Sequence, residues 1–185
     1  LESIYRKTFK TESTWLGKRI LLKCEGIAHQ AEIFLNGKSI FTHNCGYTAF
    51  SVDLTDYLNS KEKENLLCIR VDSRENLNIP PFGNVIDYMT YGGIYREVFL
   101  EVKNSIYIND VYVKTKSNHL ESEITLNTEE DIEGYTIQQR VINAYGADVE
   151  PSAIMNTGIS GRKVLTSAEV QPVVAWSLEN PVLYN

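Results

Sequence analysis

The sequence predicts an all-β protein made of two antiparallel β-sandwiches. Apolar and polar residues alternate with a period of two along many short segments, which is the pattern of half-buried strands. Asn, Gly and Pro residues separate these segments, and no long 3.6-residue periodicity competes with them. Because helical patterns do not alternate with the strands, parallel α/β folds are disfavoured and sandwiches are favoured.

The first half of the chain contains the clearest strand patterns. Ile20, Leu22 and Cys24 point to one face, and a second alternating run ends at the Asn36-Gly37 dipeptide. This dipeptide predicts a two-residue hairpin, because a type I′ turn needs positive φ at both positions. Further strands of this half are expected at 50–54, 67–71 and 94–102.

The second half carries its own set of strands. One run ends at Val102 and the next begins at Ile106, so the predicted domains are 1–103 and 104–185. The strands of the second domain are expected at 108–115, 120–126, 135–144 and 173–176.

Length, charge and hydropathy exclude several classes of partner. The 185-residue chain has a formal net charge of -6, so it lacks the clustered Lys and Arg that a nucleic-acid backbone requires. No apolar run approaches the roughly 20 residues of a membrane span, and no signal-peptide core is present. We expect no nucleic-acid or membrane partner and a cytoplasmic location. Because the sequence does not begin with Met, export of a longer parent stays open.

No cofactor or metal is expected to be held by this chain. The three cysteines, Cys24, Cys45 and Cys68, are too widely spaced for a disulfide framework or a zinc site. Cys24 and Cys68 fall in apolar strand patterns and are expected to be small buried thiols. His29 and His119 have no cysteine or carboxylate partner at ligand spacing.

The segment from Asp87 to Val98 is the most informative about function. It reads Asp-Tyr-Met-Thr-Tyr-Gly-Gly-Ile-Tyr-Arg-Glu-Val, so a carboxylate, aromatic rings and a Gly-Gly corner directly precede a strand. Glycine allows positive φ, and aromatic rings offer flat apolar faces to the C–H side of a pyranose. This composition suits a loop that contacts sugar, with Asp87 as an acceptor for hydroxyl groups.

These residues resemble a known family, glycoside hydrolase family 2, which contains β-galactosidases, β-glucuronidases and β-mannosidases. The form of the Gly-Gly motif is most similar to that of bacterial β-galactosidases. The resemblance runs in order along nearly the whole chain, through residues 5–9, 34–38, 43–50, 53–55, 79–81, 87–98 and 176–184.

The resemblance implies a jelly-roll β-sandwich followed by an immunoglobulin-like β-sandwich that is incomplete at its C-terminal end. It also implies that the two catalytic glutamates lie on a TIM barrel of about 250 residues beyond these domains. We therefore interpret the chain as an N-terminal fragment without catalytic residues. Its expected partners are the C-terminal TIM barrel of the parent chain, a carbohydrate such as a terminal β-galactoside, and further copies in a homo-oligomer.

The resemblance assigns substrate contact to Asp87 and Asn44. In the family, the aspartate six residues before the second glycine of this motif binds substrate hydroxyls in the active site, and Asp87 has that spacing to Gly93. Asn44 belongs to a neighbouring loop, from which some galactosidases of the family place an asparagine near the sugar. Composition alone would instead make Asp87 a turn residue that caps its loop.

Structural roles are expected for the remaining conspicuous residues. Four aromatic residues are expected in the core or at an interface, namely Tyr47, Phe50, Tyr91 and Tyr95. A structural hydrogen bond is expected for His43, which lies beside a glycine corner. The acidic residues 129–131 are expected on a solvated turn, and Trp176 in a segment that closes the second sandwich.

Three hypotheses about function follow. The first is the non-catalytic part of a retaining β-glycosidase, in which Asp87 completes the active site. The second is a free-standing jelly-roll carbohydrate-binding module, and the third is a structural tandem of sandwiches. A barrel-length continuation of the reading frame would favour the first over the second, and a glycan-binding assay would separate the second from the third.

Overall fold

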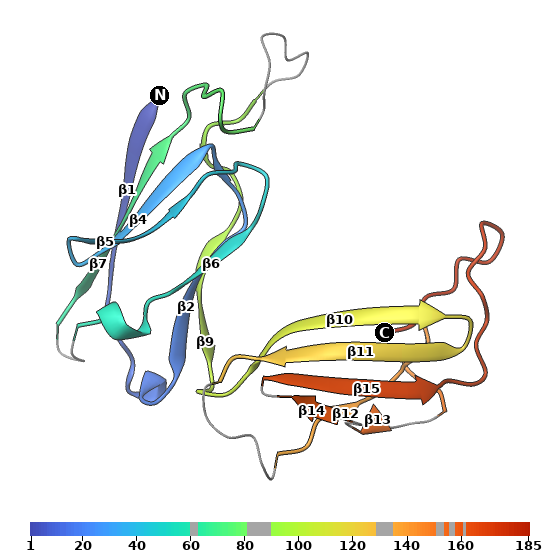
Figure 1. Ribbon diagram of the computed structural model, residues 1–185. Helices are drawn as coiled ribbons and strands as arrows, with labels where there is room; N and C mark the ends of the chain where they lie inside the picture. Colours follow the sequence, from blue (N-terminus) through green and yellow to red (C-terminus); the bar gives the residue numbers. More distant parts are fainter. Residues whose placement is uncertain (60–62, 81–89, 129–134, 151–153, 156–157, 161) are drawn as a thin grey trace. The chain divides into compact units, whose positions relative to one another are not determined.

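The computed structural model describes residues 1–59, 63–80, 90–128, 135–150, 154–155, 158–160 and 162–185. The chain folds into two compact units, Leu1–Asn104 and Ser105–Asn185, and each is described by itself. Strands make up nearly all of the regular structure in both units (Figure 1). This confirms the predicted all-β class.

The first unit contains nine strands and two short 3-10 helices among its described residues. They are β1 (Glu2–Phe9), η1 (Ser13–Trp15), β2 (Arg19–Cys24), β3 (Ile27–Ala28), β4 (Gln30–Leu35), β5 (Lys38–His43), β6 (Phe50–Asp53), η2 (Thr55–Tyr57), β7 (Asn65–Asp72), β8 (Gly93–Ile94) and β9 (Val98–Lys103).

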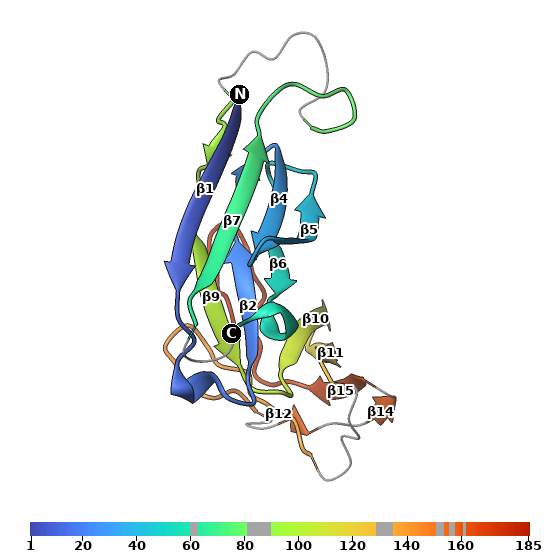
Figure 2. The same cartoon turned by 90° about the vertical axis from the view of Figure 1, so that its left-hand side faces the viewer.

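These strands form a sandwich of the jelly-roll type. One sheet has the order β1-β7-β4-β5 and the other the order β6-β2-β9, and the short pair β3-β8 lies at one end. Figure 2 shows the four-stranded sheet toward the viewer with β9, β2 and β6 behind it. All pairings within these sheets are antiparallel, as the period-two alternation predicts.

The hairpin between β4 and β5 forms at the predicted dipeptide. Asn36 has a φ of 53° and Gly37 a φ of 83°, so both turn positions have the positive φ that the prediction requires. The Asn36 side chain also accepts a hydrogen bond from the Leu66 N–H at 2.9 Å. This bond ties the hairpin to β7.

The core of the first unit lies between its two sheets. Alternate residues of the inner strands are buried there: Leu22, Cys24, Ile27, Ala31, Ile33, Leu35, Val52, Leu54, Leu67, Ile69 and Val71. Full burial of a side chain such as Leu or Ile contributes about 1.5 to 3 kcal/mol. Burial also raises the pKa of the Cys24 thiol to about 12, as expected for an unreactive structural cysteine.

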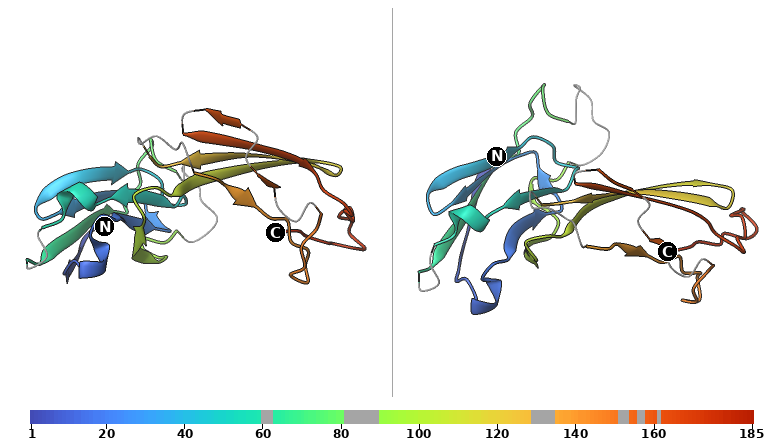
Figure 3. Two further views of the ribbon diagram at one scale, coloured as in Figure 1. Left: turned by 90° about the horizontal axis from the view of Figure 1, so that it is seen from below. Right: turned by 60° about the horizontal axis from the view of Figure 1, so that its bottom comes forward.

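The second unit is built on one larger sheet. Its strands are β10 (Ile108–Lys116), β11 (His119–Leu126), β12 (Gln138–Gln139), β13 (Ile154–Met155), β14 (Gly158–Ser160) and β15 (Lys163–Glu169). The sheet has the order β10-β11-β15-β14, and β12 pairs with β13 separately. Figure 3 shows the segment that carries β12 opposite one face of this sheet. The arrangement confirms the predicted immunoglobulin-like sandwich class.

Two predicted strands of the second unit differ from the structure. The run expected at 135–144 contains only β12 and an isolated bridge at Ile142, and residues 173–176 form no strand. A strand exists only where a neighbour supplies hydrogen bonds, and among the described residues these stretches have few such neighbours. The acidic cluster 129–131 lies outside the described residues.

The described residues contain neither a membrane-spanning helix nor a cluster of metal-ligating side chains. None of the described helices is long and apolar enough to cross a membrane. Within the same part of the chain, no group of three or more His, Cys, Asp or Glu side chains is arranged to hold a metal ion.

Candidate functional site

Three segments meet at one end of the first unit, and we call them the loop cluster: residues 43–49, 73–79 and 90–97. Residues 43–49 follow β5, residues 73–79 follow β7, and residues 90–97 surround β8. The loop cluster contains Asn44 and the described part of the motif that begins at Asp87. The sequence-based site prediction therefore falls on this cluster.

The Gly-Gly corner is fixed by close contacts on both glycines. Gly93 has a φ of +82°, and a Cβ atom there would lie 2.5 Å from the hydroxyl oxygen of Tyr5. A Cβ atom on Gly92 would lie 2.9 Å from Oγ of Ser73. Any side chain at either position would force its neighbours to move, so both positions require glycine.

Ser73 connects three strands at this corner. Its hydroxyl donates a hydrogen bond to the carbonyl of Ala28 at 2.7 Å and accepts one from the N–H of Gly93 at 3.0 Å. One hydroxyl group thereby joins the end of β7 to β3 and β8. Because its hydroxyl both donates and accepts a hydrogen bond, Ser73 fixes the point at which the 90–97 segment leaves the sandwich.

Tyr95 attaches the 43–49 loop to the 90–97 segment. Its hydroxyl donates a hydrogen bond to the carbonyl of Gly46, which is buried. The N–H groups of Tyr95 and Arg96 both donate to the carbonyl of Gly26, at 3.2 and 3.3 Å. A Cβ atom on Gly26 would lie 2.8 Å from Cζ of the Tyr95 ring, so the ring packs directly on the backbone.

This attachment gives a prediction about stability. Tyr95→Phe should lower the free energy of unfolding by about 1 to 3 kcal/mol, because it leaves the buried carbonyl of Gly46 without its donor. Tyr91→Phe is the matched control, since the Tyr91 ring is 67% exposed and its change should stay within about 0.5 kcal/mol. Urea unfolding measures both. Equal effects of the two substitutions would contradict the role of Tyr95.

Two of the four aromatic residues expected in the core or at an interface are exposed in this unit. Tyr47 and Tyr91 lie on the surface of the loop cluster, whereas Phe50 packs against the core and Tyr95 is half-buried. Tyr91 stacks on Tyr95, with ring centroids 6.4 Å apart. These two rings are outside the core because they belong to loops, where strand alternation does not decide which side chains are buried.

A polar hollow of about 310 Å³ lies beside the loop cluster. Its lining is Gln30, Asp72, Arg74, Glu75, Asn76 and Ile79. Arg74 donates to Oδ1 of Asp72 from its backbone N–H at 3.0 Å and from Nε at 2.9 Å. The hydrogen bonds from Arg74 hold the pKa of the Asp72 carboxyl well below its usual range. The hollow therefore presents a charged pair at neutral pH.

Asn44 lies next to this hollow and is exposed. Its side-chain oxygen accepts a hydrogen bond from Nε2 of Gln30 at 2.8 Å, and Gln30 also lines the hollow. Because Gln30 holds the side-chain oxygen of Asn44, it also fixes the direction of the Asn44 amide nitrogen. Nearby, His43 makes a hydrogen bond with Oγ1 of Thr48 at 3.0 Å and stacks on Phe50, so the expected structural role of His43 is confirmed.

Asp87 lies outside the described residues. The described chain ends at Pro80 on one side of it and resumes at Thr90 on the other. Sequence reasoning did not single out Gln30, Asp72 or Arg74. The only local signal was a charged pair two residues apart at the end of a strand, which is too common to indicate a site.

The loop cluster has the chemical groups that bind a polyhydroxylated ligand. It offers an exposed aromatic ring and an amide and borders the charged pair of Asp72 and Arg74, and a sugar needs flat apolar faces together with hydrogen-bonding groups.

Comparison with known proteins identifies the family. A family model described as "Glycosyl hydrolases family 2, sugar binding domain" matches residues 2–105, which is more than half of the chain. The chain belongs to glycosyl hydrolase family 2. The matched region includes the whole loop cluster.

Curated family 2 relatives match nearly all of this chain. A β-galactosidase of Thermoanaerobacter pseudethanolicus is 35% identical over 187 residues, which covers 99% of the chain and 25% of the relative. A β-galactosidase of Thermoanaerobacterium thermosulfurigenes is 30% identical over 194 residues and is covered to 27%. The chain thus spans about a quarter of the length of the curated relatives it matches.

Solved family 2 structures share the fold of both units. A putative β-galactosidase from Bacteroides fragilis has a TM-score of 0.81 at 25% identity, with 99% of this chain and 29% of that chain covered. A Parabacteroides merdae β-glucuronidase has a TM-score of 0.84 at 22% identity, with 99% and 25% covered. At such identity the likeness to the glucuronidase shows the fold alone.

Proposed function

We propose that this chain is the N-terminal, non-catalytic part of a retaining β-glycosidase of family 2 that removes terminal β-linked sugars. The observation that carries this proposal is the match of the whole chain to a quarter of two β-galactosidases. A galactoside is the favoured substrate class, because both of these relatives are named β-galactosidases. The catalytic carboxylate pair that such a reaction requires would lie in the remainder of the longer protein.

In this proposal the loop cluster forms one wall of the active site. Asp87 accepts hydrogen bonds from sugar hydroxyls, and Asn44 lies near the same sugar. Support for Asp87 comes from its sequence position before the rigid Gly92-Gly93 corner, which Ser73 and Tyr5 contact closely. Support for Asn44 comes from its exposed side chain, which Gln30 orients.

A free-standing carbohydrate-binding module is the second candidate. The exposed Tyr91 ring of the loop cluster favours it, since stacking on an aromatic ring is a usual way to hold a sugar. The parent reading frame separates the two. A continuation long enough for a TIM barrel supports the enzyme, and a stop soon after Asn185 supports the module.

The isolated 185-residue chain is expected to be inactive. It should not hydrolyse nitrophenyl β-galactoside or nitrophenyl β-glucuronide above the buffer rate, because one loop wall cannot supply the two carboxylates of the reaction. Its affinity for galactose should also be weak, since the ligand would not be enclosed. Turnover by the purified chain would refute the proposal, and tight calorimetric binding of galactose would favour the module.

A further inference from the structure

The second unit leaves one edge of its longest described strand open. β10 is nine residues long, and all of its residues are exposed. It lies at the end of the sheet order β10-β11-β15-β14, and among the described residues only β11 pairs with it. A long exposed edge strand is a ready site for pairing with another strand. The chemistry of this edge therefore decides which partner fits it.

The direction of the backbone groups of β10 follows from its neighbour β11. The N–H of Leu126 donates to a carbonyl next to β15, whereas that of Asn127 donates to a carbonyl next to β10, at 2.8 and 2.9 Å. Successive residues of a strand point their backbone groups to opposite sides, so the odd-numbered residues of β11 bond to their even-numbered partners on β10. The N–H and C=O groups that point to the open edge therefore belong to Val111, Val113 and Thr115.

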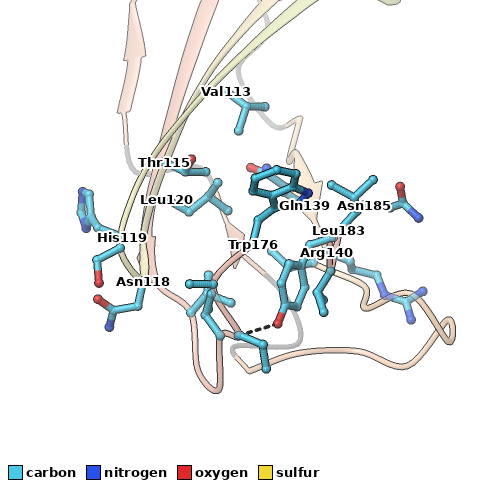
Figure 4. Close-up of a pocket in the computed structure, with 18 residues that line it drawn as sticks. Val113, Thr115, Asn118, His119, Leu120, Gln139, Arg140, Trp176, Leu183 and Asn185 are labelled. Carbon is cyan, nitrogen blue, oxygen red and sulfur yellow. Dashed lines mark hydrogen bonds between the residues drawn. The ribbon is translucent and has the colours of Figure 1, made fainter. Parts of the chain in front are cut away.

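The inner face of β10 offers two valines at the open edge. Val111 lies opposite Ile124 of β11, and Val113 lies opposite Ser122. Because Ile124 and Ser122 are only 3% and 2% exposed, both valines belong to the inner face of the sheet. On this face Val113 lines an apolar groove of about 630 Å³ (Figure 4). Val111 and Val113 are themselves 46% and 48% exposed, so each has apolar surface left for a partner.

The outer face of β10 carries an aromatic ring between two opposite charges. Tyr112 is 58% exposed. Asp110 and Lys114 are the next residues on the same face in the two directions along the strand. Nζ of Lys114 lies 5.3 Å from the centroid of the Tyr112 ring. The face thus reads acid, ring, base, and an antiparallel copy of it reads base, ring, acid.

From this arrangement we infer that β10 pairs with β10 of a second copy of the chain, antiparallel and about a two-fold axis at Tyr112. Asp110 of each copy then stands opposite Lys114 of the other, and the two Tyr112 side chains oppose each other across the axis. Val111 stands opposite Val113, and these two residues exchange backbone hydrogen bonds because both point to the open edge. Opposite charges, aromatic pairs and β-branched pairs are each favourable across strands.

This contact is closed and independent of the proposed function. Both copies use the same surface, so the pairing ends at a dimer and does not continue into a filament. The strand belongs to the second unit, whereas the loop cluster belongs to the first. Dimer formation can therefore be measured without any assay of hydrolysis or sugar binding.

The neighbouring registers fit this edge less well. An axis at Val111 would bring no acidic residue directly opposite a lysine. An axis at Val113 would place Asp110 opposite Lys116, but it would lose the ring pair and both Val–Val pairs. Lysine on an edge strand usually discourages pairing, and the register centred on Tyr112 gives Lys114 an acidic partner.

Charge reversal on the 185-residue chain tests the pairing. Asp110→Lys places two lysines opposite each other in both charge pairs, so the dimer dissociation constant from sedimentation should rise about tenfold or more. Lys114→Asp should have the same effect. The double variant Asp110→Lys/Lys114→Asp restores both pairs in the opposite sense and should return the constant to within about threefold of wild type.

Asp56→Lys is the matched control for net charge. It makes the same charge change at an exposed aspartate of the first unit and should leave the dissociation constant unchanged. A wild-type chain that stays monomeric at the highest concentration it tolerates would overturn the inference. So would a dimer that both single reversals leave intact, or a double variant that remains as weak as the single ones.

Disulfide trapping tests the register. Tyr112→Cys should cross-link two copies under mild oxidation, because at the axis the two Cα atoms of position 112 are about 4.5 Å apart. Thr115→Cys is the matched control on the same strand, since its two copies would be six residues apart along the pair, roughly 20 Å. Peptide mapping by mass spectrometry separates the bond at position 112 from bonds of the three native cysteines. A cross-link at position 115, or none at position 112 in a folded chain, would overturn the register.

Discussion

In the full-length enzyme proposed above, Asp87→Asn is expected to lower kcat/KM by about ten- to a few hundred-fold. A charge-assisted hydrogen bond contributes about 1.5 to 3 kcal/mol, and each 1.4 kcal/mol is about tenfold in kcat/KM. The amide has nearly the shape of the carboxylate, but one of its two terminal atoms is a donor. The fold should therefore be unchanged while binding of the sugar hydroxyls weakens. Steady-state kinetics with a nitrophenyl glycoside measures the effect.

Thermal unfolding of the same preparation separates this role from a structural one. If Asp87 only caps its turn, Asp87→Asn should lower the melting temperature and leave kcat/KM near the wild-type value. Asp56→Asn is the matched control, because Asp56 is an exposed aspartate of the same unit in the short helix η2. It should change neither quantity. Unchanged kcat/KM in the Asp87→Asn enzyme would remove Asp87 from the active site.

Gly93→Ala is expected to lower the stability of the first unit. A left-handed backbone costs an alanine about 1 to 2 kcal/mol, and forcing a methyl group into a filled space adds about 1 to 3 kcal/mol. The clash is with the Tyr5 hydroxyl oxygen, 2.5 Å from the new Cβ. For a unit of this size the melting temperature should drop by at least about 8 °C. Calorimetry of the 185-residue chain measures this drop.

Two further variants divide this loss into its causes. Gly17 has a φ of +73° with nothing within 4 Å of its would-be Cβ, so Gly17→Ala should show the backbone cost alone. Adding Tyr5→Phe to Gly93→Ala removes the clashing oxygen, and the ring carbon is then 3.6 Å away, which is an ordinary contact. The double variant should recover most of the steric part. Equal losses for Gly17→Ala and Gly93→Ala would show that the Tyr5 contact contributes nothing.

The fold was predictable wherever the sequence alone sets local geometry. The Asn36-Gly37 turn depends on two backbone dihedrals, and the buried face of β4 depends on strict alternation from Ala31 to Leu35. The second unit was harder to predict because residues 135–144 have the alternation of a strand but form few backbone pairings with a neighbouring strand. A sequence pattern reports which side chains are buried, whereas a strand also needs a neighbouring chain.

The candidate site was predictable only in part. The Gly-Gly corner was readable from the sequence because two adjacent glycines indicate a backbone that turns sharply or packs closely against its neighbours. The hydrogen bond between Gln30 and Asn44 could not be predicted, since it joins a strand residue to a loop residue 14 positions away. The exposure of Tyr91 and Tyr47 also depends on how the loops fold back, and no periodic pattern encodes that.

The bond from Tyr95 to the Gly46 carbonyl has a consequence for loop exchange between related proteins. Because a side chain of one loop supports the backbone of another, the 43–49 loop does not carry its own shape. A graft of residues 43–49 into a relative that lacks a tyrosine equivalent to Tyr95 should misplace the amide of Asn44. A graft should therefore move residues 43–49, residues 90–97 and Gly26 together, because Tyr95 packs on Gly26.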